Sequence, residues 1–176
     1  NIFDLAIRDA SFDIVISHGV LHHTFDARRA FAAIARKVKP GGIIMVGLYN
    51  SYARIPTWAR SKIIGLTGGR IDYVVRNRIR DARKAETWIK DQYYNPHETW
   101  HSIGDVQEWF DENDIEYLNC SPAILGTNGE AAENAGDLFR STGNGTGYQR
   151  AVTQLSWLGT IAREGALFDV IGRKRF

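Results

Sequence analysis

The chain has 176 residues, which is long enough for one domain with a substantial core, and its 44% hydrophobic and 24% charged residues are ordinary for a globular protein. A formal net charge of +2 is too small to indicate a nucleic-acid-binding protein, and no apolar run approaches the roughly 18 residues that a membrane span needs. Cys120 is the only cysteine, which excludes a disulfide framework and a thiolate zinc cluster, so we expect a reducing, cytoplasmic compartment.

The first 50 residues predict two buried strands joined by a helix. Residues 12–17 and residues 43–49 are short apolar runs rich in β-branched side chains, which is typical of buried strands. Residues 25–39 between them have helical periodicity, with Thr24 or Asp26 available as the N-cap. The expected apolar stripe consists of Phe31, Ile34, Ala35 and Val38, and the expected outward residues are Arg28, Arg29, Arg36 and Lys37. A strand, helix and strand in this order form a βαβ unit with parallel strands.

The helix is expected to end before residues 39–42, KPGG. Pro40 cannot continue a helix, and Pro40–Gly41 suits the centre of a type II turn. This turn would lead directly into the second strand.

Residues 51–100 interrupt the pattern and predict a helical insertion, with helices at about 54–66 and 72–92. The insertion is rich in aromatic residues, and its basic side chains, Arg54 among them, outnumber its acidic ones. This excess has two interpretations, a solvated helix face and a surface for an anionic substrate or a partner.

The remaining segments predict further alternation of helix and strand. Ser102 and Asp105 have the spacing of a capping box, and Ile103, Val106, Trp109 and Phe110 form an apolar stripe. The elements expected in order are a helix over 103–113, a strand over 115–125, a flexible Gly/Asn/Thr-rich loop over 126–147, a helix over 148–164 and a last strand over 166–175.

Residues 97–101, HETWH, match the H-E-x-x-H pattern of zinc hydrolases, in which a helix directs two histidines to a metal and the glutamate acts as a base. Pro96 precedes the motif and Ser102, the expected helix cap, follows it, so the motif is expected in a turn. A third ligand would have to be a carboxylate such as Glu108 or Glu112, because no histidine follows the motif. A zinc hydrolase therefore ranks a distant third, behind the two functions described in the following paragraphs.

Three motifs near the start of the chain resemble the class I S-adenosylmethionine-dependent methyltransferases. They are NIFDLAI at residues 1–7, FDIVISHGVLHHT at residues 12–24 and ARKVKPGGIIMVG at residues 35–47, in the family's order and spacing. KPGG alone indicates only a turn, but the three motifs together are much more specific. The resemblance implies an α/β fold with a partial Rossmann-like class I methyltransferase sheet, parallel strands with an antiparallel final strand, and a helical insertion. Residues 1–176 would then form one partial methyltransferase domain.

The resemblance also implies S-adenosylmethionine as the cofactor. In open α/β sheets, ligands bind beyond the carboxyl ends of the strands, where residues 17–19 and 49–50 are expected. The family's pattern implies that Asn1 and Ile2 lie beside the adenine. It also implies that Ser17, His18 and Gly19 flank the methionine half of the cofactor.

Methyl transfer mainly requires that donor and acceptor be aligned, and a general base is needed only when the acceptor must lose a proton. The candidate catalytic residues are His22, His23, Tyr49 and His97. The expected partner is a small-molecule or lipid-like acceptor, and the insertion over residues 51–100 would cover it.

One departure from the family limits these expectations. The family's glycine-rich loop and the acidic residue for the ribose hydroxyls are absent, and both would lie before Asn1, so we expect that an upstream part is missing. The chain alone should bind cofactor weakly or not at all, and its exposed strand edges should favour a homo-oligomer. The alternative function is a non-catalytic, methyltransferase-like module that binds a partner.

Overall fold

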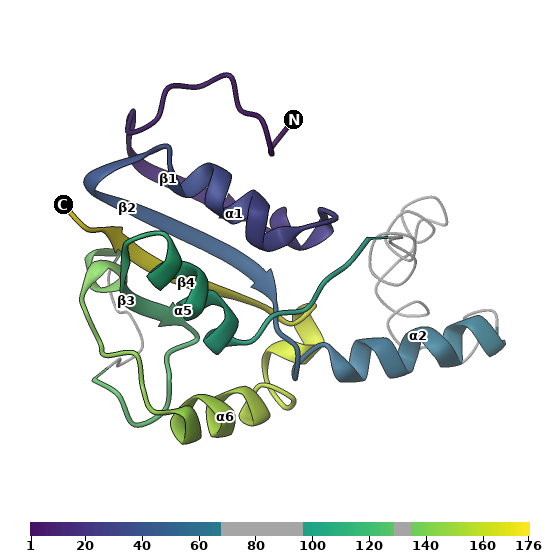
Figure 1. Cartoon of the computed structure of the whole chain (residues 1–176). Helices are drawn as coiled ribbons and strands as arrows, with labels where there is room; N and C mark the ends of the chain where they lie inside the picture. Colours follow the sequence, from purple (N-terminus) through teal and green to yellow (C-terminus); the bar gives the residue numbers. More distant parts are fainter. Residues whose placement is uncertain (68–96, 129–134) are drawn as a thin grey trace.

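The computed structural model describes residues 1–67, 97–128 and 135–176. Its centre is a four-stranded sheet in the order β1–β2–β4–β3 (Figure 1). The strands are β1 (Phe12–His18), β2 (Val38–Tyr49), β3 (Ile115–Ser121) and β4 (Leu167–Lys174). β1 and β2 are parallel neighbours, and β4 runs antiparallel to both β2 and β3. The predicted α/β fold, with parallel strands and an antiparallel final strand, is confirmed.

Helix α1 (Ala27–Ala35) forms the crossover between β1 and β2. Asp26 is its N-cap, as predicted, and accepts a hydrogen bond from the Arg29 backbone N–H over 2.9 Å. The predicted apolar stripe is buried, but its last member, Val38, already belongs to β2.

Lys37 corrects the expectation that this side chain points outward. Its stem is buried, and its ammonium donates to the Asp9 carboxylate at 2.6 Å and to the Ile7 carbonyl oxygen at 2.7 Å. The helix has ended by this position, so helical periodicity does not govern where the side chain points.

The KPGG segment is accommodated as an irregularity at the start of β2. Phe12 pairs with Val38, but Ile14 pairs with Ile43, so β2 has extra residues between these two pairings. Gly41 has a φ of +76°, the conformation that the third residue of a type II turn requires and that glycine adopts readily.

Helices α1 and α5 (Ile103–Glu112) cover one face of the sheet (Figure 1). The Phe31 ring of α1 lies 5.7 Å from the Trp109 ring and 5.6 Å from the Phe110 ring of α5, measured between centroids. Gly172 of β4 allows this packing, because a Cβ there would lie 2.5 Å from the Phe110 ring. The predicted capping box at the start of α5 is present: Ser102 and Asp105 exchange backbone-to-side-chain hydrogen bonds.

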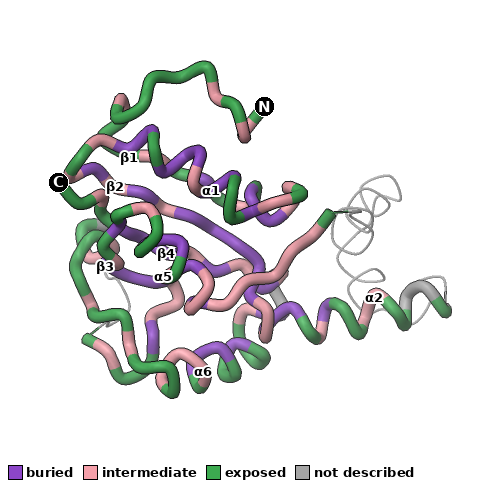
Figure 2. Tube along the Cα trace, in the orientation of Figure 1, coloured by how far each residue is buried: buried purple, intermediate pink, exposed green. Residues whose placement is uncertain are grey.

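The other face of β1 is open. Ile14 and Ile16 are 55% and 64% exposed, whereas Val15, which points the opposite way, packs against the core. β1 is also the last strand on its side of the sheet, so one of its edges has no strand partner among the described residues. The neighbouring strand β2 is buried along its second half, which is coloured mostly purple in Figure 2.

The remaining helices lie at the carboxyl end of β2 and beside α5. Helix α2 (Ile55–Thr67) begins shortly after β2 and extends away from the sheet (Figure 1), as predicted for the first helix of the insertion. The second predicted helix, at 72–92, lies outside the described residues. The segment predicted as one helix over 148–164 is α6 (Gly147–Ser156), a turn, and a 3-10 helix at Ile161–Glu164. Short 3-10 helices also occur at Leu21–His23 and Ala135–Phe139.

Within the described part of the chain, every helix is too short or too polar to be a membrane span.

Candidate functional site

The carboxyl ends of β1 and β2 meet at one edge of the sheet. Ser17 pairs with Val46 and His18 pairs with Gly47, so the predicted neighbours are in register. The Gly19 N–H donates to the Gly47 carbonyl oxygen over 3.0 Å, which extends the pairing one residue further. Two strands therefore deliver residues 17–19 and Tyr49 to the same edge.

Three predicted catalytic residues form a cluster of rings at this edge. The His22 ring lies 4.0 Å from the Tyr49 ring and 4.2 Å from the His23 ring, and the His23 and Tyr49 rings are 5.7 Å apart, measured between centroids. The cluster arises because the Leu21–His23 3-10 helix follows β1 closely and contacts β2. Sequence reasoning named all three rings but did not predict that they lie against one another, two of the pairs edge to face.

His22 is buried completely, and neither of its ring nitrogens has a hydrogen-bond partner among the described residues. Burial is the largest cause that lowers its pKa to about 3, and the neighbouring positive groups on His23 and Arg54 act in the same direction. His22 is therefore neutral at physiological pH, and with so low a pKa its imidazole is too weak a base to accept a proton there.

A buried ion pair lies against this ring cluster. Arg54 is 1% exposed, and its Nε and Nη2 donate to the two carboxylate oxygens of Glu98 over 2.8 Å and 2.6 Å. The guanidinium lies 4.0 Å from the Tyr49 ring centroid, and Nη1 donates to the Gly165 carbonyl oxygen over 3.2 Å. This corrects the interpretation of Arg54 as part of a solvated helix face.

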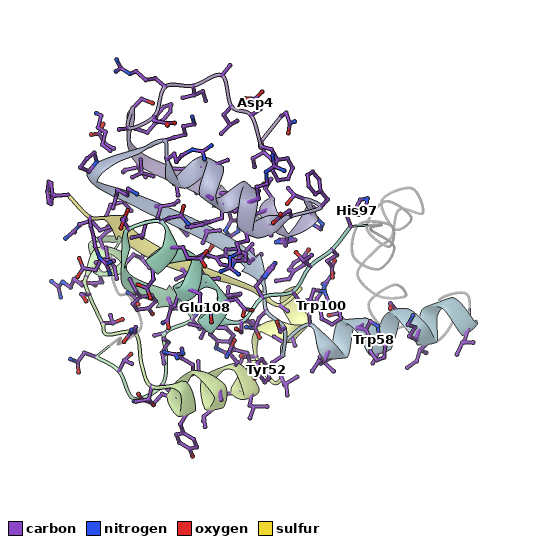
Figure 3. The ribbon with its side chains drawn as sticks, in the orientation of Figure 1. Asp4, Tyr52, Trp58, His97, Trp100 and Glu108 are labelled. Carbon is purple, nitrogen blue, oxygen red and sulfur yellow. The ribbon has the colours of Figure 1, made fainter. Side chains whose placement is uncertain are left out.

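The HETWH segment joins the sheet edge instead of forming a helix. The His101 N–H donates to the Tyr49 carbonyl oxygen over 2.9 Å, and the Thr99 N–H donates to the His22 carbonyl oxygen over 2.8 Å. Asn50 and His101 form an isolated parallel bridge. The segment therefore runs across the ends of the ring cluster and of β2, with His97 at its outer end and Trp100 nearer the sheet (Figure 3).

The side chains of this motif have local partners. Glu98 accepts from Arg54 and from the Trp100 indole N–H, the latter over 2.6 Å, and His101 Nε2 lies 2.8 Å from the Thr99 hydroxyl. The His97 carbonyl oxygen lies 3.3 Å from His23 Nδ1. Among the described residues, no three potential ligands are close enough to hold a metal ion.

The residues predicted beside the adenine lie on the segment before β1. The Asn1 side-chain oxygen accepts from the Phe3 N–H over 3.1 Å, and Ile2 packs partly against the core. The Phe3 ring stacks on Phe25 with centroids 4.3 Å apart, and the Arg29 guanidinium lies 5.5 Å from the Phe3 ring centroid. The segment is thus attached to the start of α1 by aromatic contacts.

His18 has a partner that sequence reasoning missed. Its Nδ1 lies 2.8 Å from the Asp169 Oδ1, and the two side chains cross over Gly47, which pairs with both residues. No signal in the sequence identifies this pair, because Asp169 follows His18 by 151 positions and lies inside a predicted strand. The Arg54–Glu98 pair was missed for the same reason, although Glu98 belongs to the HETWH motif.

These residues fit one side of an S-adenosylmethionine site. Gly19 has a φ of +73°, and a Cβ there would meet no heavy atom within 4 Å, so the backbone beyond β1 borders open space. The His18 side chain beside it is 52% exposed. This open space lies at the carboxyl end of β1, where the resemblance implies the methionine half of the cofactor.

Comparisons of the sequence identify similar proteins. A family model described as a methyltransferase domain matches residues 1–46. An uncharacterized protein of Synechococcus sp. is 27% identical over 146 residues, which are 69% of this chain and 35% of that protein. The chain therefore spans about a third of the length of this curated relative.

Solved structures have the same fold at low sequence identity. PKMT2 from Rickettsia typhi aligns with all of this chain and 39% of its own, with a TM-score of 0.60 and 12% identity; its complex with AdoHcy gives 0.57 and 14%. A chain of the Haloferax volcanii complex that contains the Trm112 methyltransferase activator aligns with all of this chain and 60% of its own, with a TM-score of 0.50 and 16% identity. The chain therefore has the fold of the Rossmann-like class I S-adenosylmethionine-dependent methyltransferases, and its first 46 residues match their methyltransferase-domain model.

Proposed function

We propose that this chain forms the acceptor side of an S-adenosylmethionine-dependent methyltransferase site and that the acceptor is a small molecule or a lipid-like molecule. The observation that carries the proposal is the parallel pairing of β1 with β2, which brings residues 17–19 and Tyr49 to one edge. Ligands of open α/β sheets bind at such an edge. The match of residues 1–46 to a methyltransferase domain supplies the class of reaction.

In this proposal the cofactor provides a methyl group on a positively charged sulfur, which is already a good leaving group. The residues of this chain bind and orient the cofactor. Asn1 and Ile2 contact the adenine, and Ser17, His18 and Gly19 flank the methionine half. The open space beside Gly19 supports this assignment, because a bulky residue in the left-handed conformation there would be strained and would fill it.

The ring cluster of His22, His23 and Tyr49 forms the floor of the acceptor site, with His97 at its outer rim. Burial keeps His22 neutral, so we assign it a packing role. His23, Tyr49 and His97 remain candidates for contact with the acceptor. The Arg54–Glu98 pair holds the two described ends of the insertion at the sheet edge. The part of the insertion that was predicted to cover the acceptor, residues 68–96, lies outside the described residues.

A second candidate function is a non-catalytic module that binds a partner through a methyltransferase-like surface. The sequence encoded directly upstream of Asn1 separates the two functions. A buried strand followed by a glycine-rich turn supports the enzyme, and a degenerate turn supports the module.

The proposal is tested by release of S-adenosylhomocysteine from S-adenosylmethionine. The assay uses the chain extended by its encoded upstream sequence, with a primary amine, a phenol, an alcohol and a fatty acid as acceptor probes. We expect release that depends on the acceptor, and a large loss of release in Tyr49→Ala, which removes part of the floor. Cofactor binding without release with any probe would favour the module, and absence of binding would contradict both the cofactor and the reaction.

A further inference from the structure

We propose that His18 and Asp169 form a proton-accepting dyad, in which His18 Nε2 takes the proton that the acceptor loses during methyl transfer. This inference rests on the proposed function and deepens it. It assigns the base to a residue that the sequence suggested only as a cofactor contact. It also narrows the acceptor to molecules with a proton to lose, that is, amines and hydroxyls.

The first argument is the geometry of the pair. His18 Nδ1 lies 2.8 Å from Asp169 Oδ1, and the Asp169 side chain is 17% exposed while His18 is 52% exposed. A carboxylate is an acceptor, so it holds the proton of a neutral imidazole on Nδ1 and leaves the Nε2 lone pair available. Nε2 has no hydrogen-bond partner among the described residues. A histidine oriented by a carboxylate in this way has the arrangement of a general base.

The second argument is Gly47, which lies between the two partners. It pairs with His18 on β1 and with Asp169 on β4, so the three residues form one row across the sheet. A Cβ on residue 47 would lie 2.5 Å from Asp169 Oδ1 and 2.6 Å from His18 Nδ1. The dyad is therefore possible only because this position has no side chain.

The third argument is position. His18 is the last residue of β1, immediately before Gly19 and its open space. In the proposed function this is beside the methionine half of the cofactor, and thus beside the methyl group that moves. The acceptor atom must approach to within about 3–3.5 Å of that carbon, which also brings it near His18.

The other titratable groups around the dyad do not compete for this role. His22 is buried and neutral, because burial is the largest cause that lowers its pKa, so it does not take up the acceptor's proton. The Cys120 thiol on β3 is buried, and burial, followed by the Asp169 charge, raises the pKa of this thiol. Gly47 on β2 contributes no side chain. Asp169 is therefore the charged group in direct contact with His18.

The step is balanced. The bond between the methyl carbon and the sulfur of the sulfonium donor breaks, and its electron pair stays on sulfur. A bond forms between the methyl carbon and the acceptor nitrogen or oxygen, and the proton of that atom moves to His18 Nε2. Asp169 stabilises the imidazolium that results, and solvent later removes the proton.

The first test requires no ligand. Long-range ¹H–¹⁵N correlation spectra of this chain report which ring nitrogen of His18 carries the proton in the neutral state. We expect Nδ1 in the wild type, and loss of this preference in Asp169→Ala and in Gly47→Ala. The matched control is Asp13→Asn. Asp13 lies on β1 with His18, and the substitution removes its exposed ion pair with Lys39 of β2, so it should not change the His18 signals. A proton on Nε2 in the wild type, or unchanged signals in both dyad variants, would overturn the proposal.

The second test separates proton transfer from a structural role. In His18→Asn the amide can still donate to Asp169, but no basic nitrogen remains. With the extended chain and the acceptor from the release assay, we expect turnover to fall by about 10² or more, a larger factor than any change in the KM for S-adenosylmethionine. The loss should shrink as pH rises, because the acceptor then loses its proton to solvent. Wild-type turnover in His18→Asn would overturn the dyad's role, whereas absence of release from the wild type would contradict the proposed function and leave the spectroscopic result standing.

Discussion

The Arg54–Glu98 pair is the residue-level feature with the largest expected effect on stability. Removing one partner of a buried ion pair leaves an uncompensated charge, which costs about 3–5 kcal/mol. We therefore expect Glu98→Gln to lower the free energy of unfolding by several kcal/mol in urea titrations, because Arg54 is 1% exposed and keeps its charge.

The matched control for this prediction is Glu112→Gln. Glu112 also pairs with an arginine, Arg28, but both side chains are about half exposed. Such pairs contribute about 0–1 kcal/mol, so this variant should be close to wild type. Equal effects of the two substitutions would contradict the view that the Arg54–Glu98 pair fixes the ends of the insertion.

The lowered pKa of the buried His22 imidazole leads us to expect a specific dependence of stability on pH. The folded protein keeps this imidazole neutral to about pH 3, while the unfolded chain takes up a proton near the ordinary value of 6.5. The unfolded state therefore binds more protons between these limits, and stability falls as pH falls through that range.

The variant His22→Leu should lack this contribution. Between about pH 7.5 and about pH 5, the wild type should lose about 2 kcal/mol more than the variant, since each pH unit below 6.5 costs about 1.4 kcal/mol. Urea titrations at both pH values measure the difference. Parallel losses in the two proteins would mean that His22 becomes protonated without unfolding.

What the sequence could predict at this scale depended on separation along the chain. The capping box of Ser102 and Asp105 and the Asp26 cap are interactions over three residues, so spacing alone identified them. The partners Arg54 and Glu98 are separated by 44 positions, and His18 and Asp169 by 151. No periodicity reports such pairs, because they exist only once the sheet has assembled.

At the level of elements, the predicted order of strands and α-helices was correct in the described residues, but the short 3-10 helices at Leu21–His23 and Ala135–Phe139 were not predicted. Alternation and helical periodicity report which face of an element is buried, so β1, α1, β2 and α5 could be predicted. The predictions that were wrong concern the boundaries of single elements. The helix predicted over 148–164 ends at Ser156, and β2 begins before the KPGG turn. Gly159 follows soon after that helix end and is a poor helix former.

The open side of β1 predicts self-association. Ile14 and Ile16 are exposed on a strand whose outer edge is unpaired among the described residues, and such edges pair with other chains. We expect sedimentation equilibrium to show concentration-dependent dimers of this chain that Ile16→Lys suppresses. Tyr148→Lys is the matched control, because Tyr148 is an exposed ring on α6. Dimers that persist in Ile16→Lys and disappear in the control would place the contact elsewhere.

At the level of the whole molecule, the account depends on the sheet edge that β1 and β2 share. The fold alone does not assign a function, so the edge must be tested directly. The resemblance in the first 46 residues predicts where a cofactor would contact this chain, and the parallel register of β1 and β2 makes one contiguous site possible. The same sequence cannot identify the acceptor, because no residue pattern encodes the shape of its site.

The most direct measurement is a titration of the ¹⁵N-labelled chain with S-adenosylhomocysteine, followed by amide chemical shifts. The account predicts weak binding, with the changes concentrated at Ser17–Gly19 and Asn1–Ile2. Helix α6 (Gly147–Ser156), which is remote in sequence from both segments, should be unaffected and serves as the internal reference. Changes that spare residues 17–19 and 1–2, or that are largest in α6, would contradict the assignment of this edge as a methyl-donor site.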